Sequence, residues 1–406
     1  MTAPTRLSFD TAAASLSADP GEGLAQTAES GLIAACRPQV LRKLLPPEQR
    51  AADRFATAFA VAVCAAEASD ALLDRLRAQA SHTALMLSGG GKLGNYHIGV
   101  ARALLAQGLL PRIISGSSAG AFIGALLTTR TDAELTKLLA GDGPELATLS
   151  LDGAIEAASV AFSQPGLRRF LDRLIPDLTL VEARAVSGRS LHIVVGENAG
   201  GGRVLNADLT PDVLIRDAVV ASCAIPFVYP SVQIAERHAD GSKGFLSEGR
   251  EFIDGSIHAD LPSAWLREHC GVTLLVASVV NPYELPFLTD PDHHGPAIHA
   301  ATTMGMGMIR NAMSAGVGMA LPFFQAMPDG ARALSIWKRV LDQRIEADVI
   351  IAPGQRMHDP IGLTERVTGA QLMNFIAEGE AAAGAKLSLL SPSLRIERAL
   401  ALARAG

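Results

Sequence analysis

Residues 85–100 read LMLSGGGKLGNYHIGV: an apolar run, three consecutive glycines and the start of a helix-like pattern. A strand, a glycine loop and a helix in succession are typical of an α/β fold. Backbone N–H groups of such a loop, at the amino end of a helix, favour a negatively charged partner. Three partners fit this description: a dinucleotide, a nucleotide phosphate, or a charge that exists only during a reaction.

Both nucleotide-binding patterns fail in this loop. Gly89, Gly91 and Gly94 match the G-x-G-x-x-G spacing of a dinucleotide fold. That fold requires an acidic residue at the end of the next strand, where this chain has RIISGSSAG. The G-x-x-x-x-G-K-[ST] pattern also fails, because Lys92 precedes the last glycine and no serine or threonine follows it in register. We therefore disfavour a nucleotide-binding protein.

A second glycine-flanked turn follows the next apolar run. Residues 116–120 read GSSAG, which matches G-x-S-x-G at one place in the chain. This pattern is typical of a serine held on a sharp strand-to-helix turn. The sequence AGAFIGALLTT that continues from it is small-sided and apolar, as a buried helix should be. Ser118 is therefore the predicted nucleophile, and Ser117 is interpreted as a hydrogen-bonded turn residue.

The predicted nucleophile gives the glycine loop a chemical use. Attack by a serine on an ester carbonyl creates an oxyanion, and each preorganised N–H donor stabilises that charge by about 3 kcal/mol in the transition state. We expect the backbone N–H groups of Gly89, Gly90, Gly91 and Lys92 to be these donors. The Lys92 side chain itself is interpreted as solvated.

The nucleophile also needs a base within hydrogen-bond reach. Asp254 follows the apolar pair Phe252 and Ile253 and precedes Gly255. This context predicts a carboxylate at the end of a buried strand, where burial raises its basicity. Asp254 is therefore the predicted base. Asp152, in LSLDGAIEAA, is the alternative, and helix N-capping is its structural interpretation.

A histidine base stays open on the residues alone. His97 lies on the helix after the glycine loop and is interpreted as packed or hydrogen-bonded. A Ser-Asp-His triad would use a later histidine. None of the later candidates has a distinctive sequence context: His258, His269, His293, His294, His299 and His358.

Together these segments resemble the patatin-like acyl hydrolases. LSGGGKLGNYHIGVARAL is similar to the family's oxyanion loop, GSSAG to its nucleophile turn, ASCAIPFVYPSV (residues 221–232) to its proline-containing segment, and FIDGS to its aspartate motif. The specific part of the resemblance covers residues 84–282. It implies a three-layer α/β/α fold with a mostly parallel central sheet. It also implies a Ser-Asp dyad, here Ser118 and Asp254, without a catalytic histidine, metal or cofactor.

One departure favours a particular branch of this family. Many members have Arg or Lys before the last glycine of the loop, where this chain has Leu93. Leucine there, the segment LRKLLPPEQRAADRFATAFA before the core and SVVNPY after the aspartate resemble the triacylglycerol-lipase branch. The resemblance implies a lipase that cleaves fatty-acyl esters, with phospholipase A activity left open. A catalytically silent lipid-binding relative is the alternative.

The composition fits a folded protein of 406 residues that does not bind nucleic acid. Apolar residues make up 49% and the net charge is −6, whereas phosphate binding requires a basic face. Four scattered cysteines favour reduced thiols and no zinc site. The sequence has no recognisable signal peptide and no membrane-spanning run. We expect a cytoplasmic protein with peripheral contact to a membrane or lipid droplet; its oligomeric state stays open.

The apolar runs divide the chain into three predicted parts. They are an N-terminal helical extension (1–82), a catalytic domain (83–355) and a C-terminal helical segment packed on the catalytic domain (356–406). Strands of the catalytic domain are predicted at 84–87, 112–115, 191–195, 272–280 and 347–351.

Residues 303–327 read TMGMGMIRNAMSAGVGMALPFFQAM and contain six of the ten methionines. Two interpretations stay open. The segment is either a flexible core helix or an adaptable apolar lid over a lipid site, since methionine packs against varied partners. Arg310, Asn311 and Pro322 argue against a membrane span.

Overall fold

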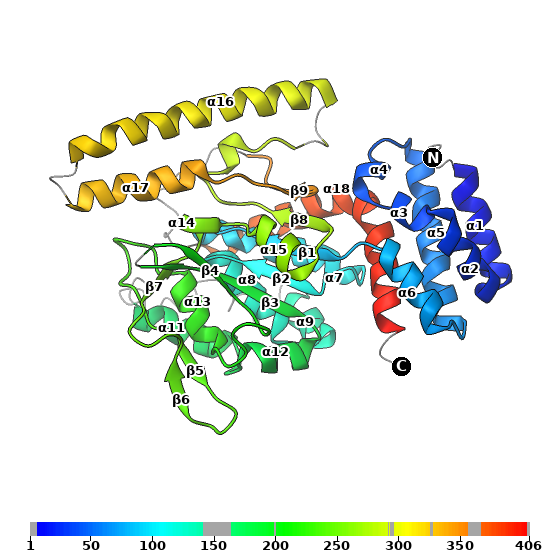
Figure 1. Cartoon of the computed structure of the whole chain (residues 1–406), viewed down its shortest axis with the longest axis horizontal. Helices are drawn as coiled ribbons and strands as arrows, with labels where there is room; N and C mark the ends of the chain where they lie inside the picture. Colours follow the sequence, from blue (N-terminus) through cyan, green and yellow to red (C-terminus); the bar gives the residue numbers. More distant parts are fainter. Residues whose placement is uncertain are drawn as a thin grey trace.

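A mostly parallel sheet forms the centre of the molecule (Figure 1). The computed structural model describes residues 6–140, 164–198, 200–290, 292, 296–324, 328–355 and 367–403. The strand order is β4-β3-β2-β1-β8-β9, and β7 also pairs with β3. Strands β4 and β7 are antiparallel to β3, and the other pairings are parallel. The strands are β1 Thr83–Leu87, β2 Ile113–Gly116, β3 Ser190–Glu197, β4 Gly202–Leu205, β7 Phe252–Asp254, β8 Leu274–Ser278 and β9 Val349–Ile351.

Strand β1 is buried on both of its faces, which is typical of a parallel sheet covered by helices. Ala84 and Met86 pack into a smaller core with Leu266 of α15 (Ser263–Cys270). Leu85 and Leu87 face a larger core. That core includes residues of α7 (Tyr96–Ala106), α8 (Ala119–Thr128), α12 (Leu180–Ser187), α13 (Ile215–Ser222) and α18 (Gly369–Leu402). The predicted three-layer α/β/α fold is confirmed.

The predicted strands agree with β1, β2, β3, β8 and β9 to within a few residues. The sequence analysis missed β4 and a separate two-stranded hairpin, β5 (Ala235–Arg237) and β6 (Lys243–Phe245). The remaining catalytic-domain elements are η1 Gly91–Asn95, α9 Asp132–Leu139, α11 Gln164–Leu174, α14 Ser256–Ala259, η3 Leu285–Phe287, α16 Pro296–Ala320, η4 Leu321–Phe324 and α17 Pro328–Asp342.

Helices α16 and α17 pack against each other and form the upper edge of the molecule in Figure 1. Methionines 304, 308 and 319 of α16 are 69%, 63% and 71% exposed, so the interpretation of this segment as a core helix is wrong. Among the helices in the described ranges, none has the length and apolar character needed to cross a bilayer.

The N-terminal segment is helical, as predicted, and has a hydrophobic core of its own. Helix α5 begins at Pro46, a residue suited to the first turn of a helix. The C-terminal half of α18 completes this second core with Leu389, Ile396 and Leu400, and Figure 1 shows α18 running from the catalytic domain to the N-terminal helices. The helices are α1 Arg6–Ala18, α2 Pro20–Ser30, α3 Leu32–Ala35, α4 Pro38–Leu41, α5 Pro46–Ala65 and α6 Asp70–Gln79.

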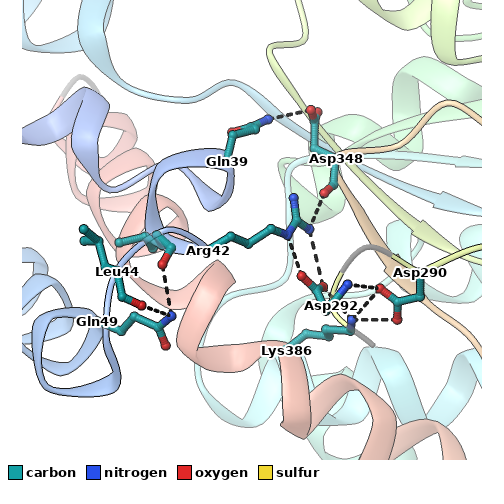
Figure 2. Close-up of polar contacts among 9 residues, drawn as sticks. Gln39, Arg42, Leu44, Gln49, Asp290, Asp292, Asp348 and Lys386 are labelled. Carbon is teal, nitrogen blue, oxygen red and sulfur yellow. Dashed lines mark hydrogen bonds and ion pairs between the residues drawn. The ribbon is translucent and has the colours of Figure 1, made fainter. Parts of the chain in front are cut away.

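A buried ion-pair network joins the N-terminal helices to the catalytic domain (Figure 2). The Lys386 ammonium group donates to both oxygens of Asp290 at 3.0 and 2.8 Å and to Asp292 at 2.5 Å. Arg42, which follows α4, pairs with Asp292 and donates to the main-chain carbonyl of Asp348 at 2.5 Å. Burial raises the pKa of Asp292, but the Arg42 and Lys386 contacts outweigh it and hold that pKa below its ordinary value.

Candidate active site

Ser118 lies at the turn between β2 and α8, as the N-cap of that helix. Its backbone φ is 50°, a strained value for a residue other than glycine. Gly120 allows the helix to approach the sheet, since a Cβ at this position would lie 2.1 Å from the Leu87 carbonyl oxygen. This is the strand-to-helix geometry expected of a G-x-S-x-G turn.

The register of the sheet places Asp254 at the level of Ser118. Gly116, the last residue of β2, pairs with Ile193 of β3. Asp254, the last residue of β7, pairs with Val195, further along β3 in the direction that β2 was running. Strand β2 ends at Gly116, and the chain then turns away from β3 at Ser118. Beyond this point, β7 pairs with the same edge of β3.

The Asp254 carboxyl is buried beside the serine hydroxyl. Burial is the largest influence and raises the pKa of Asp254 to about 6, while the hydrogen bonds from Ser256 and the nearby Ser118 hydroxyl act in the opposite direction. Oδ1 accepts the N–H and hydroxyl of Ser256 at 2.8 and 2.7 Å. Oδ2 is buried and accepts no hydrogen bond of ordinary geometry from the described residues. A carboxylate with raised basicity and an available oxygen is suited to general-base catalysis.

The end of α13 fixes the position of the turn. Ser222 Oγ accepts the N–H of Ser118 at 2.8 Å and donates to the Val194 carbonyl oxygen at 2.7 Å. Burial raises the pKa of the adjacent Cys223 thiol, and the nearby Ser118 hydroxyl acts in the opposite direction. The thiol therefore stays protonated at neutral pH, and Ser118 remains the stronger nucleophile candidate once its proton is removed.

The glycine loop lies against the serine, since a Cβ at Gly89 would lie 3.4 Å from the Ser118 Cβ. The N–H of Gly89 donates to Asp260 Oδ1 at 2.6 Å. This donor is therefore committed within the protein, contrary to the prediction that it faces an oxyanion. Within the described part of the chain, the N–H groups of Gly90 and Gly91 have no acceptor. The Lys92 side chain is half-buried rather than fully solvated.

Asp260 is a site residue that the sequence analysis missed. This buried carboxylate accepts hydrogen bonds from the Gly89 N–H, the Ser117 hydroxyl and the Asn281 side-chain amide. Burial raises its pKa, and these hydrogen bonds act in the opposite direction. Asp260 thus joins the glycine loop to the serine turn, and Ser117 is hydrogen-bonded as predicted. The available signal was an acidic residue in the largely apolar segment IHADLPSAW (residues 257–265), six positions after Asp254.

His97 is hydrogen-bonded, as predicted, and one of its contacts is to Ser88, the residue directly before the glycine loop. It is fully buried; burial lowers its pKa to about 4, so the ring is neutral. Its Nδ1 lies 2.7 Å from Ser278 Oγ and its Nε2 lies 2.9 Å from the Ser88 carbonyl oxygen. The carbonyl can only accept, so Nε2 carries the proton and Nδ1 accepts from the Ser278 hydroxyl.

The other candidate bases lie elsewhere or outside the described residues. His258 contacts Arg339 at 3.2 Å, and His269 contacts the Trp265 carbonyl at 3.1 Å. Asp152, His293, His294 and His358 lie outside the described residues. The described part of the chain contains no group of three or more His, Cys, Asp or Glu side chains arranged to hold a metal ion.

Comparison with known proteins gives a consistent result. A family model described as patatin-like phospholipase matches residues 85–264, which include the glycine loop, the serine turn and Asp254. The triacylglycerol lipase ptl3 of Schizosaccharomyces pombe is 35% identical over 237 residues, covering 54% of this chain and 49% of that protein. Triacylglycerol lipase 4 of Saccharomyces cerevisiae is 30% identical over 344 residues, covering 79% of this chain and 38% of that protein. The chain thus spans about half or less of the length of these relatives.

A solved structure, VipD from Legionella pneumophila, matches 76% of this chain and 67% of that chain at 15% identity, with a TM-score of 0.39.

Proposed function

The chain belongs to the patatin-like phospholipase family through residues 85–264, and we propose that it is a serine acyl hydrolase that cleaves fatty-acyl esters of lipids. The observation that carries this proposal is the register of β2 and β7 on β3, which brings Ser118 and Asp254 together beside the glycine loop. The names of the two yeast relatives support triacylglycerol as the substrate.

The first half of the reaction forms an acyl-enzyme. Asp254 accepts the hydroxyl proton of Ser118 while the serine oxygen attacks the ester carbonyl carbon. The carbonyl oxygen becomes an oxyanion, for which the uncommitted N–H groups of Gly90 and Gly91 are the proposed donors. Collapse of this intermediate breaks the ester bond, and the proton on Asp254 passes to the departing alcohol oxygen.

The second half releases the fatty acid. Asp254 accepts a proton from a water molecule, which attacks the acyl-enzyme carbonyl and forms a second oxyanion at the same N–H groups. When this intermediate collapses, Ser118 leaves and regains its proton from Asp254. Asp260 and His97 take no proton in this scheme, since they hold the loop that carries the donors.

Labelling by a fluorophosphonate probe tests this assignment. We expect covalent modification of Ser118, at a rate that rises as the pH increases through about 6 and then levels off. The sign follows because Asp254 must be deprotonated to accept the serine proton, and its pKa is raised to about 6. The measurement is the labelling rate from pH 4.5 to 8.5, with peptide mapping of the modified residue.

The same experiment separates the alternatives. A chain that binds lipid vesicles but is not labelled would be a silent lipid-binding protein. Labelling at another residue would contradict the proposed nucleophile. Hydrolysis of a panel of triacylglycerol, diacylglycerol and phosphatidylcholine by the labelled and unlabelled protein then identifies the substrate class.

Helix α16 supports peripheral contact with a lipid surface. Arg310, the one Lys or Arg on this helix, is turned inward, where its guanidinium donates to both Glu284 oxygens at 2.9 and 2.8 Å. The outward positions instead present Ile298, Met304, Met308 and Met319. Helix α17 packs against α16 and links it to the site: Gln343, just after α17, donates to the Ser256 carbonyl at 2.7 Å and accepts the Asp260 N–H at 2.9 Å. An uncharged, methionine-rich face beside the site suits insertion into neutral lipid.

The triple variant Met304→Ser, Met308→Ser, Met319→Ser tests this contact. We expect its binding to a triacylglycerol emulsion to fall by about tenfold or more, because each change removes exposed apolar area from the contact. Hydrolysis of a short, water-soluble ester should be unchanged. The matched triple change to Leu should retain emulsion binding. Equal losses on both substrates, or unchanged emulsion binding, would contradict the role of α16.

A further inference from the structure

We infer that a second cleft, at the amino ends of the parallel strands, binds a long-chain carboxylate. The cleft has a volume of about 630 Å³, within the range of about 300–1,000 Å³ usual for small-ligand sites. Its lining includes Ser81 just before β1, Arg112 just before β2 and Arg189 just before β3. Ser118 and Asp254 lie at the opposite ends of the strands, so this cleft is separate from the candidate active site.

The cleft concentrates positive charge in an acidic protein. The chain has a net charge of −6, yet Arg77, Arg112, Arg189 and Arg398 all line this one cleft. The lining carboxylates are Asp132 and Glu397. Asp132 already pairs with Arg189 and Arg398. Glu397 is buried and accepts hydrogen bonds from Thr83, and burial raises its pKa, which favours its neutral form. Arg77 pairs with Asp74, which is not a lining residue. When the four arginines are set against Asp74, Asp132 and a largely neutral Glu397, the cleft keeps a net positive charge, which favours an anionic ligand.

Two buried lining residues carry polar atoms that the described part of the protein leaves without hydrogen bonds. Arg189 is 6% exposed, and its Nη2 contacts Asp132, but its Nε and Nη1 have no acceptor there. Ser81 is also 6% exposed, and its Oγ is likewise unsatisfied. An unmet hydrogen bond of this kind costs about 1–3 kcal/mol. The planar arginine fork matches a carboxylate. Because Nε and Nη1 are buried, a bound carboxylate would supply the missing acceptors after a shift of the Arg189 side chain toward the cleft. Arg112 lies at the surface, and its positive charge acts on the neighbouring Glu397, whose pKa it lowers against the larger effect of burial.

The apolar part of the lining fits an aliphatic chain. It is formed by leucine, valine, alanine and proline, and the described residues around the cleft include no Phe, Tyr or Trp on which a nucleobase could stack. Val186 and Leu402 remain 42% and 49% exposed at this cleft. A ligand with a carboxylate head at Arg189 and Arg112 and an alkyl tail along these side chains meets both requirements. The fatty acid released by the proposed hydrolase is such a ligand, and this identification alone rests on the proposed function.

Isothermal titration of the full chain with decanoate, decanol, acetate and inorganic phosphate tests the inference. We expect decanoate to bind at least about tenfold more tightly than the other three, because only it carries both groups. Arg112→Glu should weaken decanoate binding by at least about tenfold, the loss expected for one charge-assisted hydrogen bond. Val186→Ser should weaken it by about threefold. Arg75→Glu, a matched reversal of an exposed arginine outside the cleft, should have no effect.

Three results would overturn the inference: decanoate binding that Arg112→Glu leaves unchanged, phosphate or acetate binding as tightly as decanoate, or no decanoate binding. Both variants change exposed side chains, and a thermal melt confirms that each is folded. The titration requires no turnover. A protein that binds decanoate through Arg112 but is not labelled at Ser118 would contradict the proposed function and leave this inference intact.

Discussion

Replacing Asp254 with Asn is expected to lower kcat for ester hydrolysis by a factor on the order of 10²–10⁴, the usual contribution of a general base. The amide of the variant can still occupy the buried position but cannot accept the proton of Ser118. Ser118→Ala should lose at least about 10⁴-fold, since it removes the group that forms the covalent bond. Steady-state hydrolysis of a short ester, with active sites counted by fluorophosphonate labelling, measures both effects.

The fold should not be harmed by the Asp254 change. Burial raises the pKa of Asp254 to about 6 from an ordinary value of 3.8, so ionisation of this group costs folding free energy at neutral pH. The cost lies on the order of 3 kcal/mol, and it develops as the pH rises from about 4 to 6. Asp254→Asn should therefore be at least as stable as the wild type at pH 7. A destabilised variant with near-normal kcat would contradict the proposed role.

Asp260→Asn provides the contrasting variant. Its amide oxygen can still accept from Gly89 or Ser117, but its NH₂ group would meet the NH₂ group of Asn281. We expect a loss of kcat smaller than that of Asp254→Asn, with labelling of Ser118 retained at a reduced rate. The apparent pKa of the labelling rate should fall slightly below that of the wild type, because the Asp260 charge contributes, as the smallest influence, to the raised pKa of Asp254.

Replacing Lys386 with Met is expected to destabilise the protein by about 3–5 kcal/mol, the usual cost of breaking a buried ion pair. Lys386 is 7% exposed, and its replacement removes the ammonium group that pairs with the buried Asp290 carboxylate. Arg42 would still pair with Asp292, so the effect is centred on Asp290. The measurement is urea unfolding, monitored by fluorescence and by far-UV circular dichroism. The loss of stability appears as a lower urea midpoint.

Two further variants make the stability test specific. Adding Asp290→Asn to Lys386→Met should recover part of the lost stability, because it removes the uncompensated charge. Lys338→Met breaks the exposed pair with Asp342 and should cost less than about 1 kcal/mol. Similar losses of unfolding free energy for Lys386→Met and Lys338→Met would contradict the stabilising role proposed for the buried network.

The sequence predicted those features that depend on local pattern. The β1–loop–α7 and β2–turn–α8 units each contain the strand, the glycines and the helix within a short stretch, so their type and order could be read directly. Asp254 was identified because its neighbours Phe252 and Ile253 indicate a buried strand. The commitment of the Gly89 N–H could not be predicted, because its acceptor, Asp260, lies far along the chain and only the fold brings the two together.

The location of the methionine-rich segment illustrates the same limit. Its composition fits both a core helix and an exposed apolar helix, since burial depends on what packs against it. In the structure, the pairing of Arg310 with Glu284 fixes which face of α16 turns inward and therefore which methionines are exposed. The cleft at the amino ends of the strands also could not be predicted from the sequence. Its arginines come from α6, from α18 and from the residues that precede β2 and β3.

Helix α18 limits how this protein can be divided in the laboratory. Its residues alternate between two cores, with Leu390 and Leu394 in one and Leu389 and Ile396 in the other. A fragment begun at residue 83 would leave the C-terminal half of this helix as an exposed apolar ridge. A fragment trimmed to residues 85–264 would lose the whole helix, and with it part of the larger core. Expression of such a fragment should yield aggregates, and enzymology on this chain is best designed around the entire polypeptide.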